Sequence, residues 1–386
     1  MKYTIGQLAE IIDGDRGKNY PQQHEFLEDG YCLFLNTGNV TATGFSFESN
    51  QYISKEKCDL LRKGKLQRRD IVYTTRGTVG NAAFYADSVP YEHIRINSGM
   101  VIIRPDEDVV CTEFLYQILK SDYYRPYFKK YCTGSAQPQL PIKNFSTIEL
   151  DLPDLETQKK IADILSSYDD LIENNQKQIK LLGEAAQRLY KEWFVDLRFP
   201  GHETTPITDG IPKGWAEGTL ADLAVFKRGK TITKGQVNEG TVPVVAGGLE
   251  PAYYHDTPNT DAPVITVSGS GANAGFTRMY YTKVWASDCS YIDVSFTHDI
   301  AWVYCFLKEN KASIDSMQKG AAQPHVYAKD LNAMKAVVPC DSLMDQFRTA
   351  AEPMFSKIGK LEMQIKMLTE ARDRLLPKLM NGEIEV

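Results

Sequence analysis

Several short segments of this chain contain residue types that are used in catalysis, but their spacing does not complete any known catalytic motif. Gly229-Lys230-Thr231 has the ending of a phosphate-binding loop, yet Ala224 stands where that loop needs its first glycine, so the backbone offers no cradle for a phosphate. Glu309-Asn310-Lys311 has the Glu-x-Lys spacing of some nucleases without a convincing upstream aspartate. The six histidines are dispersed, and the seven cysteines form no CxxC pair. We therefore expect no catalytic residue, no metal and no cofactor.

Composition indicates an ordinary soluble protein and gives no sign of a nucleic-acid partner. Of the 386 residues, 42% are hydrophobic and 24% are charged, and the net charge is −6. Residues 1–150 carry 18 basic and 18 acidic side chains, so this segment has no basic excess. No run is apolar enough for a signal peptide or a membrane span, and the scattered cysteines indicate buried thiols. We expect a cytoplasmic protein without membrane contact, and a case for nucleic acid must come from the architecture.

The chain contains one long unit written twice. Residues 134–138 recur as residues 320–324, an offset of 186 that continues without a gap to Leu189 and Leu375. Of the 61 positions from Gly134 to Phe194, 15 are identical to their partners, several times the number that unrelated segments give. Upstream the correspondence continues with changes of loop length. One group of matches pairs Gly77, Asn81, Ala82 and Phe84 with Gly269, Asn273, Ala274 and Phe276. Another group pairs Gly6, Leu8, Arg16, Gly17 and Lys18 with Gly218, Leu220, Arg228, Gly229 and Lys230. One duplication predicts two similar domains related by pseudo-twofold symmetry.

The first part of each copy has the sequence pattern of a mixed α+β domain. It comprises about residues 1–150 and 205–338. Short apolar runs bounded by turn residues predict strands at 70–75, 100–103 and 263–267. Apolar spacing predicts one helix at 113–121 and its counterpart at 299–308. Residues 196–213, with their Pro, Gly and Thr, are interpreted as a linker.

The second part of each copy, residues 154–196 and 341–380, is predicted to be helical. Apolar residues recur every seven positions, the pattern of helices that pack lengthwise against each other. Pro353 and its partner Ser167 predict a break near 166–168 and 352–354, followed by a helix of roughly 28 residues, about 42 Å long. Asn175 is either a buried residue that fixes the register or an exposed one without a role. The predicted seam consists of Ile161, Leu165, Tyr168, Ile172, Leu182, Leu189, Phe347, Leu361, Leu368 and Leu375.

The expected fold is therefore α+β, with two similar mixed domains separated by two long antiparallel helices packed as a coiled coil. The expected domains are residues 1–152, a helical spacer at 153–199, residues 200–338, and a second spacer at 339–386. Two DNA-reading domains work best about 34–36 Å apart, one turn of the duplex, and the predicted helices are close to that length. Such a chain would bind a two-part DNA target with a gap of fixed length. Paired helices are more often simple dimerisation or packing elements, so the helices alone also suit a coiled-coil scaffold without nucleic acid.

This order of segments resembles the specificity subunit of type I restriction-modification enzymes over nearly the whole chain. The resemblance is carried by motifs that are weak singly but specific in order, spacing and duplication: Arg76-Gly77-Thr78-Val79-Gly80-Asn81, the Gly-x-Ala-Gln-Pro segments at 134–138 and 320–324, Leu152-Pro153 with the helix start that follows, and Ile211-Pro212-x-Gly214-Trp215. It implies two target-recognition domains that bind double-stranded DNA. It also implies docking of two adenine-methyltransferase subunits and, through them, of restriction subunits that translocate and cut DNA.

The second copy departs from the motifs of the first in two places. Residues 268–272, Ser-Gly-Ser-Gly-Ala, replace the Arg-Gly-Thr-Val-Gly pattern, and residues 341–344 replace Leu-Glu-Thr-Gln at 155–158. Docking on the second helical region is therefore less strongly implied than on the first. An enzyme that acts on nucleic acid directly is a third hypothesis, which nuclease or methyltransferase activity of the lone chain would support.

The duplication also separates candidate base contacts from candidate phosphate contacts. If the two domains bind different sequences, residues identical between them cannot carry the difference, so base readers should be polar residues that differ at matched positions. On this basis Arg76 against Ser268, and Gln139 against His325, are candidate base readers, whereas Gly77 with Gly269 and Asn81 with Asn273 suit turn geometry. Each could instead be a solvated surface residue. The predicted DNA-contacting set is Arg16, Lys18, Arg76, Asn81, Gln137, Gln139, Arg228, Lys230, Ser270, Asn273, Gln323 and His325.

Overall fold

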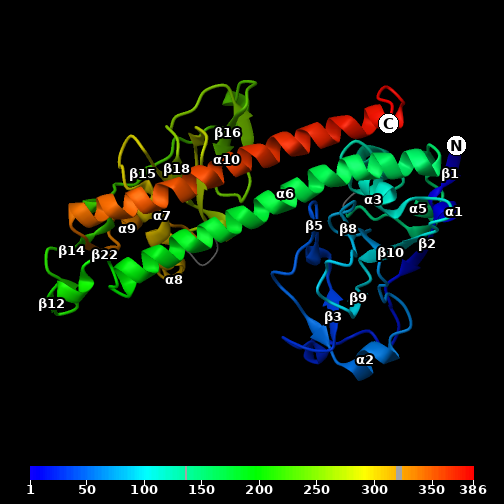
Figure 1. Ribbon diagram of the computed structural model, residues 1–386, viewed down its shortest axis with the longest axis horizontal. Coiled ribbons are helices and arrows are strands. Elements are labelled where there is room, and N and C mark those ends of the chain that lie inside the picture. Colours follow the sequence, from blue (N-terminus) through cyan, green and yellow to red (C-terminus); the bar gives the residue numbers. More distant parts are fainter. Residues whose placement is uncertain (135–136, 319–323) are drawn as a thin grey trace. The chain divides into compact units, whose positions relative to one another are not determined.

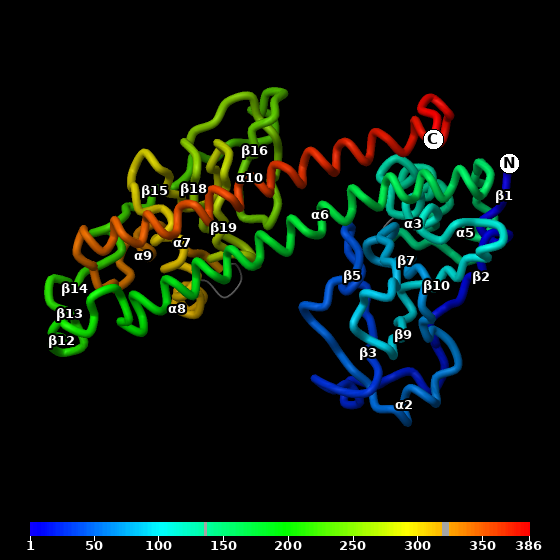
Figure 2. The backbone as a smooth tube through the Cα atoms, in the orientation of Figure 1, coloured from blue at the N-terminus to red at the C-terminus, as the bar shows by residue number. Residues whose placement is uncertain are grey.

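The computed structural model describes residues 1–134, 137–318 and 324–386 (Figure 1). It divides into two compact units. The first unit comprises Met1–Glu173 and Lys366–Val386, and the second comprises Asn174–Ile365. Each unit is therefore a globular part completed by portions of two long helices, α6 (Leu155–Tyr190) and α10 (Asp341–Met380). The course of the backbone can be followed in Figure 2.

In the first unit the globular part is built on a four-stranded antiparallel sheet of order β2-β10-β7-β8. The same part also contains a separate three-stranded sheet of order β6-β3-β9, in which β3 and β9 are parallel. This second sheet and α2 lie on the side of the unit that is away from α6 (Figure 1). The elements are β1 (Lys2–Thr4), α1 (Ile5–Leu8), β2 (Ala9–Asp13), β3 (Cys32–Leu35), β4 (Val40–Thr41), β5 (Gly44–Phe45), β6 (Tyr52–Ile53), α2 (Lys55–Leu60), β7 (Ile71–Thr74), β8 (Ala82–Phe84), β9 (Ile94–Ile96), β10 (Met100–Pro105), α3 (Thr112–Lys120), α4 (Arg125–Lys129), α5 (Ile142–Ser146) and β11 (Glu149–Asp151).

The core of this unit follows from its apolar runs. Strand β7 is buried along its whole length, as are the first four residues of β10, because helices or a second sheet cover both faces. Helix α3 contributes Phe114, Leu115 and Ile118 from one face. The predicted strands at 70–75 and 100–103 and the predicted helix at 113–121 are confirmed.

The second unit has the same topology as the first. Its four-stranded antiparallel sheet has the order β15-β21-β18-β19, its three-stranded sheet has the order β17-β16-β20 with β16 and β20 parallel, and β14 pairs with β22 as β1 pairs with β11. The elements are β12 (Ile207–Thr208), β13 (Ile211–Pro212), β14 (Ala216–Thr219), β15 (Lys227–Arg228), β16 (Val242–Val245), β17 (Tyr253–His255), β18 (Val264–Ser268), β19 (Thr277–Tyr280), β20 (Trp285–Ala286), β21 (Cys289–Asp293), α7 (Ile300–Glu309), α8 (Lys311–Ser316), α9 (Ala328–Asn332) and β22 (Lys335–Val338). The predicted strand at 263–267 and helix at 299–308 are confirmed.

Residues 196–213 are more ordered than the predicted linker. They contain a short 3₁₀ turn at His202–Thr204 and the β12–β13 hairpin. Phe199 and Trp215 pack together there against Leu343 of α10, with the two rings 5.1 Å apart. This aromatic contact gives the segment a small core of its own, which explains the order.

The predicted breaks in the long helices are wrong. Helix α6 is continuous over 36 residues and α10 over 40, about 54 and 60 Å at the usual rise per residue. Pro353 lies within α10 on its exposed side, and Thr349, whose carbonyl loses its partner, is exposed to water. Burial of Phe347, Ala351 and Phe355 on the opposite side outweighs the one lost hydrogen bond. Ser167 bonds its hydroxyl to the Ile164 carbonyl inside the helix instead of capping one.

The two long helices contact each other within each unit. In the first unit Asp169 of α6 pairs with Arg372 of α10 at 2.7 Å, and Lys160 donates to the carbonyl of Val386 at 3.4 Å, so the helices run antiparallel there. In the second unit Tyr190 and the residues after it pack their rings around Phe347. Of the predicted seam, Ile161, Leu165, Ile172, Phe347 and Leu361 are buried and Tyr168, Leu182, Leu189, Leu368 and Leu375 are partly buried. Asn175 is also buried, at 8% exposure, which favours the first of its two interpretations.

The cysteines are all free thiols. Cys32, Cys58, Cys289 and Cys305 are buried, whereas Cys111, Cys132 and Cys340 are only partly so, against the expectation of uniform burial. Burial raises the pKa of both Cys289 and Cys305 to about 12, which leaves these thiols protonated and unreactive. In the part of the chain that the structure describes, no helix combines the length and hydropathy needed to cross a bilayer.

Candidate nucleic-acid interface

In the first unit, three backbone segments meet at one end of the four-stranded sheet. The amides of Thr75 and Arg76, after β7, both donate to the carbonyl of Gly99 before β10, at 2.9 and 3.1 Å. The amide of Leu140 donates to the carbonyl of Thr75 at 2.9 Å and brings in the third segment. Arg76 and Gln139 are thereby paired in an antiparallel bridge, which places both side chains on the same side of the backbone. The structure thus brings these two predicted base readers together, both half-buried.

Asn81 lies inside the β7–β8 turn rather than on the surface. It is 8% exposed, donates its side-chain amide to the carbonyl of Val40 at 2.9 Å and accepts from Arg125 at 3.4 Å. The turn itself depends on Gly77 and Gly80, whose φ angles of 71° and 104° favour glycine. The geometry therefore gives Asn81 a structural task in shaping the turn.

The other predicted contacts of the first unit are exposed. Arg16 lies close to the Arg76 segment, because it donates to the carbonyl of Ser98 at 3.3 Å, and it also pairs with Asp13 at 3.1 Å. Lys18 and Gln137 are exposed on the loops after β2 and after Gly134. Both side chains are exposed, and among the residues that the structure describes no contact orients them toward Arg76.

The second unit repeats this arrangement with different side chains. The amide of Gly269 donates to the carbonyl of Asp288 at 3.2 Å, and the amide of Val326 donates to the carbonyl of Gly269 at 3.1 Å. Ser270 and His325 are paired in an antiparallel bridge, as Arg76 and Gln139 are in the first unit. The predicted base reader His325 is thus paired with Ser270, another residue of the predicted DNA-contacting set.

These hydrogen bonds correct the sequence pairing of the two copies. Gly269 takes the place of Thr75, so Arg76 corresponds to Ser270, and Gly77 corresponds to Gly271, which has a φ of 80°. The sequence match of Arg76 with Ser268 and of Gly77 with Gly269 is therefore wrong by two residues, and Gly269 has no left-handed φ. The second turn is also one residue longer, because Thr74 and Ser268 donate their amides to the carbonyls of Asn81 and Phe276. Ser268 itself is 3% exposed and donates to the carbonyl of Gly247, so it cannot contact a base.

The upstream pairing is wrong by three residues. The amides of Ile5 and Leu220 donate to the carbonyls of Ile148 and Met334, which occupy matched positions. With this register, Arg228 of β15, bridged to Ser290, corresponds to Asp13 of β2, bridged to Val101. The match of Arg16 with Arg228 and of Lys18 with Lys230 consequently fails, and with it the reason for treating them as shared phosphate contacts. All four are nevertheless exposed basic residues.

The remaining predicted residues of the second unit have separate positions. Lys230 is exposed, and its ammonium lies 5.9 Å from the centre of the Trp285 ring. Asn273 closes the short turn Gly271–Asn273 and accepts the amide of Phe276 through its carbonyl, so it is a turn residue but does not correspond to Asn81. Gln323 lies outside the described residues.

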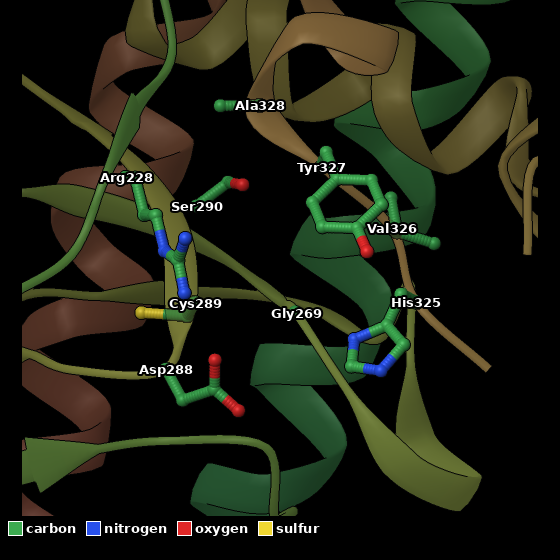
Figure 3. Close-up of a pocket in the computed structure, with 9 residues that line it drawn as sticks. All are labelled: Arg228, Gly269, Asp288, Cys289, Ser290, His325, Val326, Tyr327 and Ala328. Atoms are coloured by element: carbon green, nitrogen blue, oxygen red, sulfur yellow. The ribbon is translucent and has the colours of Figure 1, made fainter. Parts of the chain in front are cut away.

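A recess of about 220 Å³ opens beside the Ser270–His325 bridge (Figure 3). Arg228, Asp288, His325 and Tyr327 contribute polar groups to its wall, and Asp288 accepts a hydrogen bond from the hydroxyl of Ser270. The rings of His325 and Tyr327 are stacked, with an angle of 8° between them. Asp288 and Tyr327 were missed from the sequence. The sequence signal for Asp288 is that it stands where the first copy has Gly99, and this correspondence appears only in the corrected register.

Within the described ranges, no group of histidine, cysteine, aspartate and glutamate side chains could hold a metal ion. The arrangement consists of hydrogen-bond donors and acceptors on loops held by a rigid sheet. Such a surface can bind and discriminate a ligand by its pattern of donors and acceptors.

Comparison with known proteins gives consistent relatives. The family model described as type I restriction modification DNA specificity domain matches residues 1–183. The type I restriction enzyme MjaIX specificity subunit of Methanocaldococcus jannaschii is 28% identical over 344 residues, covering 82% of this chain and 78% of that protein. The HindI specificity subunit of Haemophilus influenzae is 24% identical, covering 98% of this chain and 100% of that protein. The crystal structure of a type I restriction-modification S subunit from M. genitalium has a similar fold, with a TM-score of 0.59 at 18% identity over 98% of this chain and 96% of that chain.

Proposed function

Because the chain belongs to the specificity subunits of type I restriction-modification systems, we propose that it binds a two-part DNA target, one part with each unit. Specificity subunits are non-catalytic components that recognise DNA sequence for such systems. The observation that carries the two-part target is the repeated topology. Two sheets of the same strand order present Arg76 with Gln139 in one unit and Ser270 with His325 in the other. Matching backbones with different polar side chains suit two different half-sites.

We further propose that the long helices dock two adenine-methyltransferase subunits, and through them restriction subunits, in the cytoplasm. Support comes from two exposed apolar residues at matched positions of the duplication, Leu181 of α6 and Met367 of α10, which are 63% and 55% exposed. Apolar side chains held in water at matched positions suit two copies of one partner. Replacing either one by aspartate should remove one methyltransferase copy from the complex, as measured by native mass spectrometry. Retention of both copies in both variants would argue against this surface.

Methylation mapping tests the DNA target directly. The chain is co-expressed with its methyltransferase, and modified sites are sequenced. The expected outcome is a gapped motif with two specified parts, and a continuous motif would contradict the proposal. Duplex affinity of the complex should also fall steeply with salt, whereas a scaffold without nucleic-acid binding would show no duplex affinity. Arg76→Ala should relax only the half-site bound by the first unit, at a cost of about 1–3 kcal/mol if Arg76 makes a bidentate base contact.

The fixed gap is proposed to depend on the stiffness of α6 and α10. Four residues inserted after Glu173 in α6 and four after Ile365 in α10 fall where the two units divide, so the packing inside each unit is kept. Each helix would lengthen by about 6 Å, roughly the rise of two base pairs. We expect a longer gap between unchanged half-sites. The same insertion after the exposed Asp209 is the control and should leave the gap as it is. An assembled double insertion with the original gap would rule out the helices as spacers.

A further inference from the structure

The recess of the second unit contains a carboxylate, that of Asp288, which is held in place through one of its two oxygens. Asp288 accepts from the hydroxyl of Ser270 through Oδ2. Among the residues that the structure describes, nothing donates a hydrogen bond to its second oxygen, Oδ1. Asp288 is half-buried and forms part of the wall of the recess (Figure 3). An oriented acceptor without a donor is therefore available to a ligand.

The surroundings of Asp288 carry the charges and planar groups that a base edge requires. The guanidinium of Arg228 enters the same recess, and the stacked rings of His325 and Tyr327 stand on its other side (Figure 3). Lys329 lies 5.7 Å from the centre of the Tyr327 ring. A carboxylate near DNA repels phosphates, so its presence among basic residues is unfavourable for general affinity. Its useful contact is with a group that only donates.

In the major groove only two of the four bases present a group that only donates hydrogen bonds. Cytosine presents its N4 amino group and adenine its N6 amino group, whereas guanine and thymine present carbonyl oxygens at the corresponding places. A carboxylate would accept from the first two and repel the second two. The chemistry that fits Oδ1 is thus an exocyclic amino group.

The first unit shows that this acceptor is not part of the shared scaffold. Gly99 stands at the position of Asp288, Asp13 at that of Arg228, and Arg76 at that of Ser270. Donor and acceptor are therefore distributed differently on the same backbone. We propose that Asp288, oriented by Ser270, specifies a base with an exocyclic amino group, cytosine or adenine, at one position of the half-site bound by the second unit.

This inference rests on the proposed function, and its test uses the complete methyltransferase complex with duplexes that vary all four bases at each specified position. Asp288→Asn is expected to reduce discrimination about tenfold at one position of one half-site, because the amide can also donate to a carbonyl oxygen. Ser270→Ala should relax the same position less. Arg76→Ala must affect the other half-site. Preference for cytosine or for adenine in the wild type identifies which amino group is bound.

Asp209→Asn removes one exposed negative charge outside the recess and is the matched control, expected to leave every position unchanged. If Asp288→Asn raises affinity equally for all sequences, Asp288 acts only through its charge and the inference is wrong. The same conclusion follows if every base preference survives the substitution. If the wild-type complex itself recognises no gapped motif, the proposed function fails instead, so the two failures are distinguishable.

Discussion

At corresponding places the two units hold the long helices by different contacts, charged hydrogen bonds in the first unit and buried apolar side chains in the second. In the first unit Asp169 of α6 lies among Arg372 of α10 and Gln117 and Lys120 of α3, and it accepts hydrogen bonds from all three. Counted by the offset of 186, the second unit has Phe355 in place of Asp169 and Ala186 in place of Arg372, and both are buried.

The two helices also exchange roles between the units. The carboxylate of the first unit belongs to α6, whereas the phenyl ring of the second belongs to α10 and packs edge-on against Tyr304 of α7 at 5.7 Å. Apolar packing depends little on the orientation of the side chains, whereas the hydrogen bonds of a charged cluster require one relative orientation of donors and acceptors. The first unit therefore fixes the seating of its helices by geometry, and the second obtains it by burial.

In the cluster of Asp169, Lys120, Gln117 and Arg372, burial and the neighbouring charges shift the pKa values in opposite directions. Burial alone would raise the pKa of the Asp169 carboxyl, but the charge and hydrogen bonds of Lys120, with those of Gln117 and Arg372, hold it below its usual range. Burial lowers the pKa of Lys120 by more than Asp169 raises it. Removing the carboxylate would leave two desolvated cations without their shared partner.

The largest effect is expected from giving the second unit a charge. Phe355→Asp removes a buried ring and places a carboxylate without a partner against Tyr304, which should cost about 5 kcal/mol of unfolding free energy. Hydrogen exchange should rise in peptides of the second unit and much less in those of the first. Leu181→Asp, on the exposed surface of α6, is the control and should change stability by less than about 0.5 kcal/mol. Equal losses in the two variants would contradict the contrast between the units.

Removing the carboxylate of the first unit should have the next largest effect. Asp169→Ala leaves Lys120 without its ion-pair partner and Arg372 with Asp373 alone, at a cost of about 3 kcal/mol measured by denaturant unfolding. The neighbouring Asp170 is exposed, so Asp170→Ala should be nearly neutral. Hydrogen exchange should now rise in the first unit. A loss confined to the second unit would show that the cluster is not what holds α10 there.

The pH dependence of stability should also distinguish Asp169. Its folded-state pKa lies below the unfolded value near 3.8, so its contribution is complete above about pH 4 and is lost as the pH falls through the folded value. The difference in unfolding free energy between the wild type and Asp169→Asn should therefore be constant near neutral pH and shrink in acid. Phe355→Leu should show no such trend, because no titrating group is removed. A constant difference for Asp169→Asn down to pH 2 would be inconsistent with an ionised carboxylate in the cluster.

The smallest effects are expected where the long helices hold the starts of α3 and α7. Gln158 is buried and accepts the amide of Cys111 at 3.0 Å, so Gln158→Ala should cost about 1–2 kcal/mol by orphaning that amide. In the second unit Arg348 instead binds Asp299 at 2.9 Å, with its side chain 31% exposed. Arg348→Ala should cost about 0.5 kcal/mol, as exposed ion pairs do. Thermal unfolding of both variants tests the order, which would be reversed if the ion pair dominated.

The duplication could be predicted from sequence wherever the chain length between matched residues is constant. From Gly134 to Leu189 the offset never changes, and the bridges of Gln139 and His325 agree with it. Upstream, identical glycines within four residues of each other made the register ambiguous. Only the hydrogen bonds of Thr75 and Gly269 resolve it. The error paired Arg76 with the buried Ser268 instead of with Ser270 and concealed the relation of Asp288 to Gly99.

The predicted helix breaks failed for a different reason. Proline lowers helix stability locally, but which side of the helix it occupies depends on tertiary packing that local sequence does not encode. Pro353 occupies the side toward water, and Ser167 satisfies its hydroxyl within the helix. The recess likewise joins residues from four distant segments, around positions 228, 269, 288 and 325, so periodicity gave no indication of it.

The first unit is assembled from two separate stretches of chain, whereas the second is one unbroken stretch. On a ribosome the later half of the molecule can therefore complete its fold while the earlier half still waits for Lys366–Val386 to be translated. Until then Asp169 and Lys120 lack Arg372, and Leu165 lacks the cover of Leu376. A premature stop before residue 366 should spare the second sheet and leave the first with an open, proteolysis-sensitive flank.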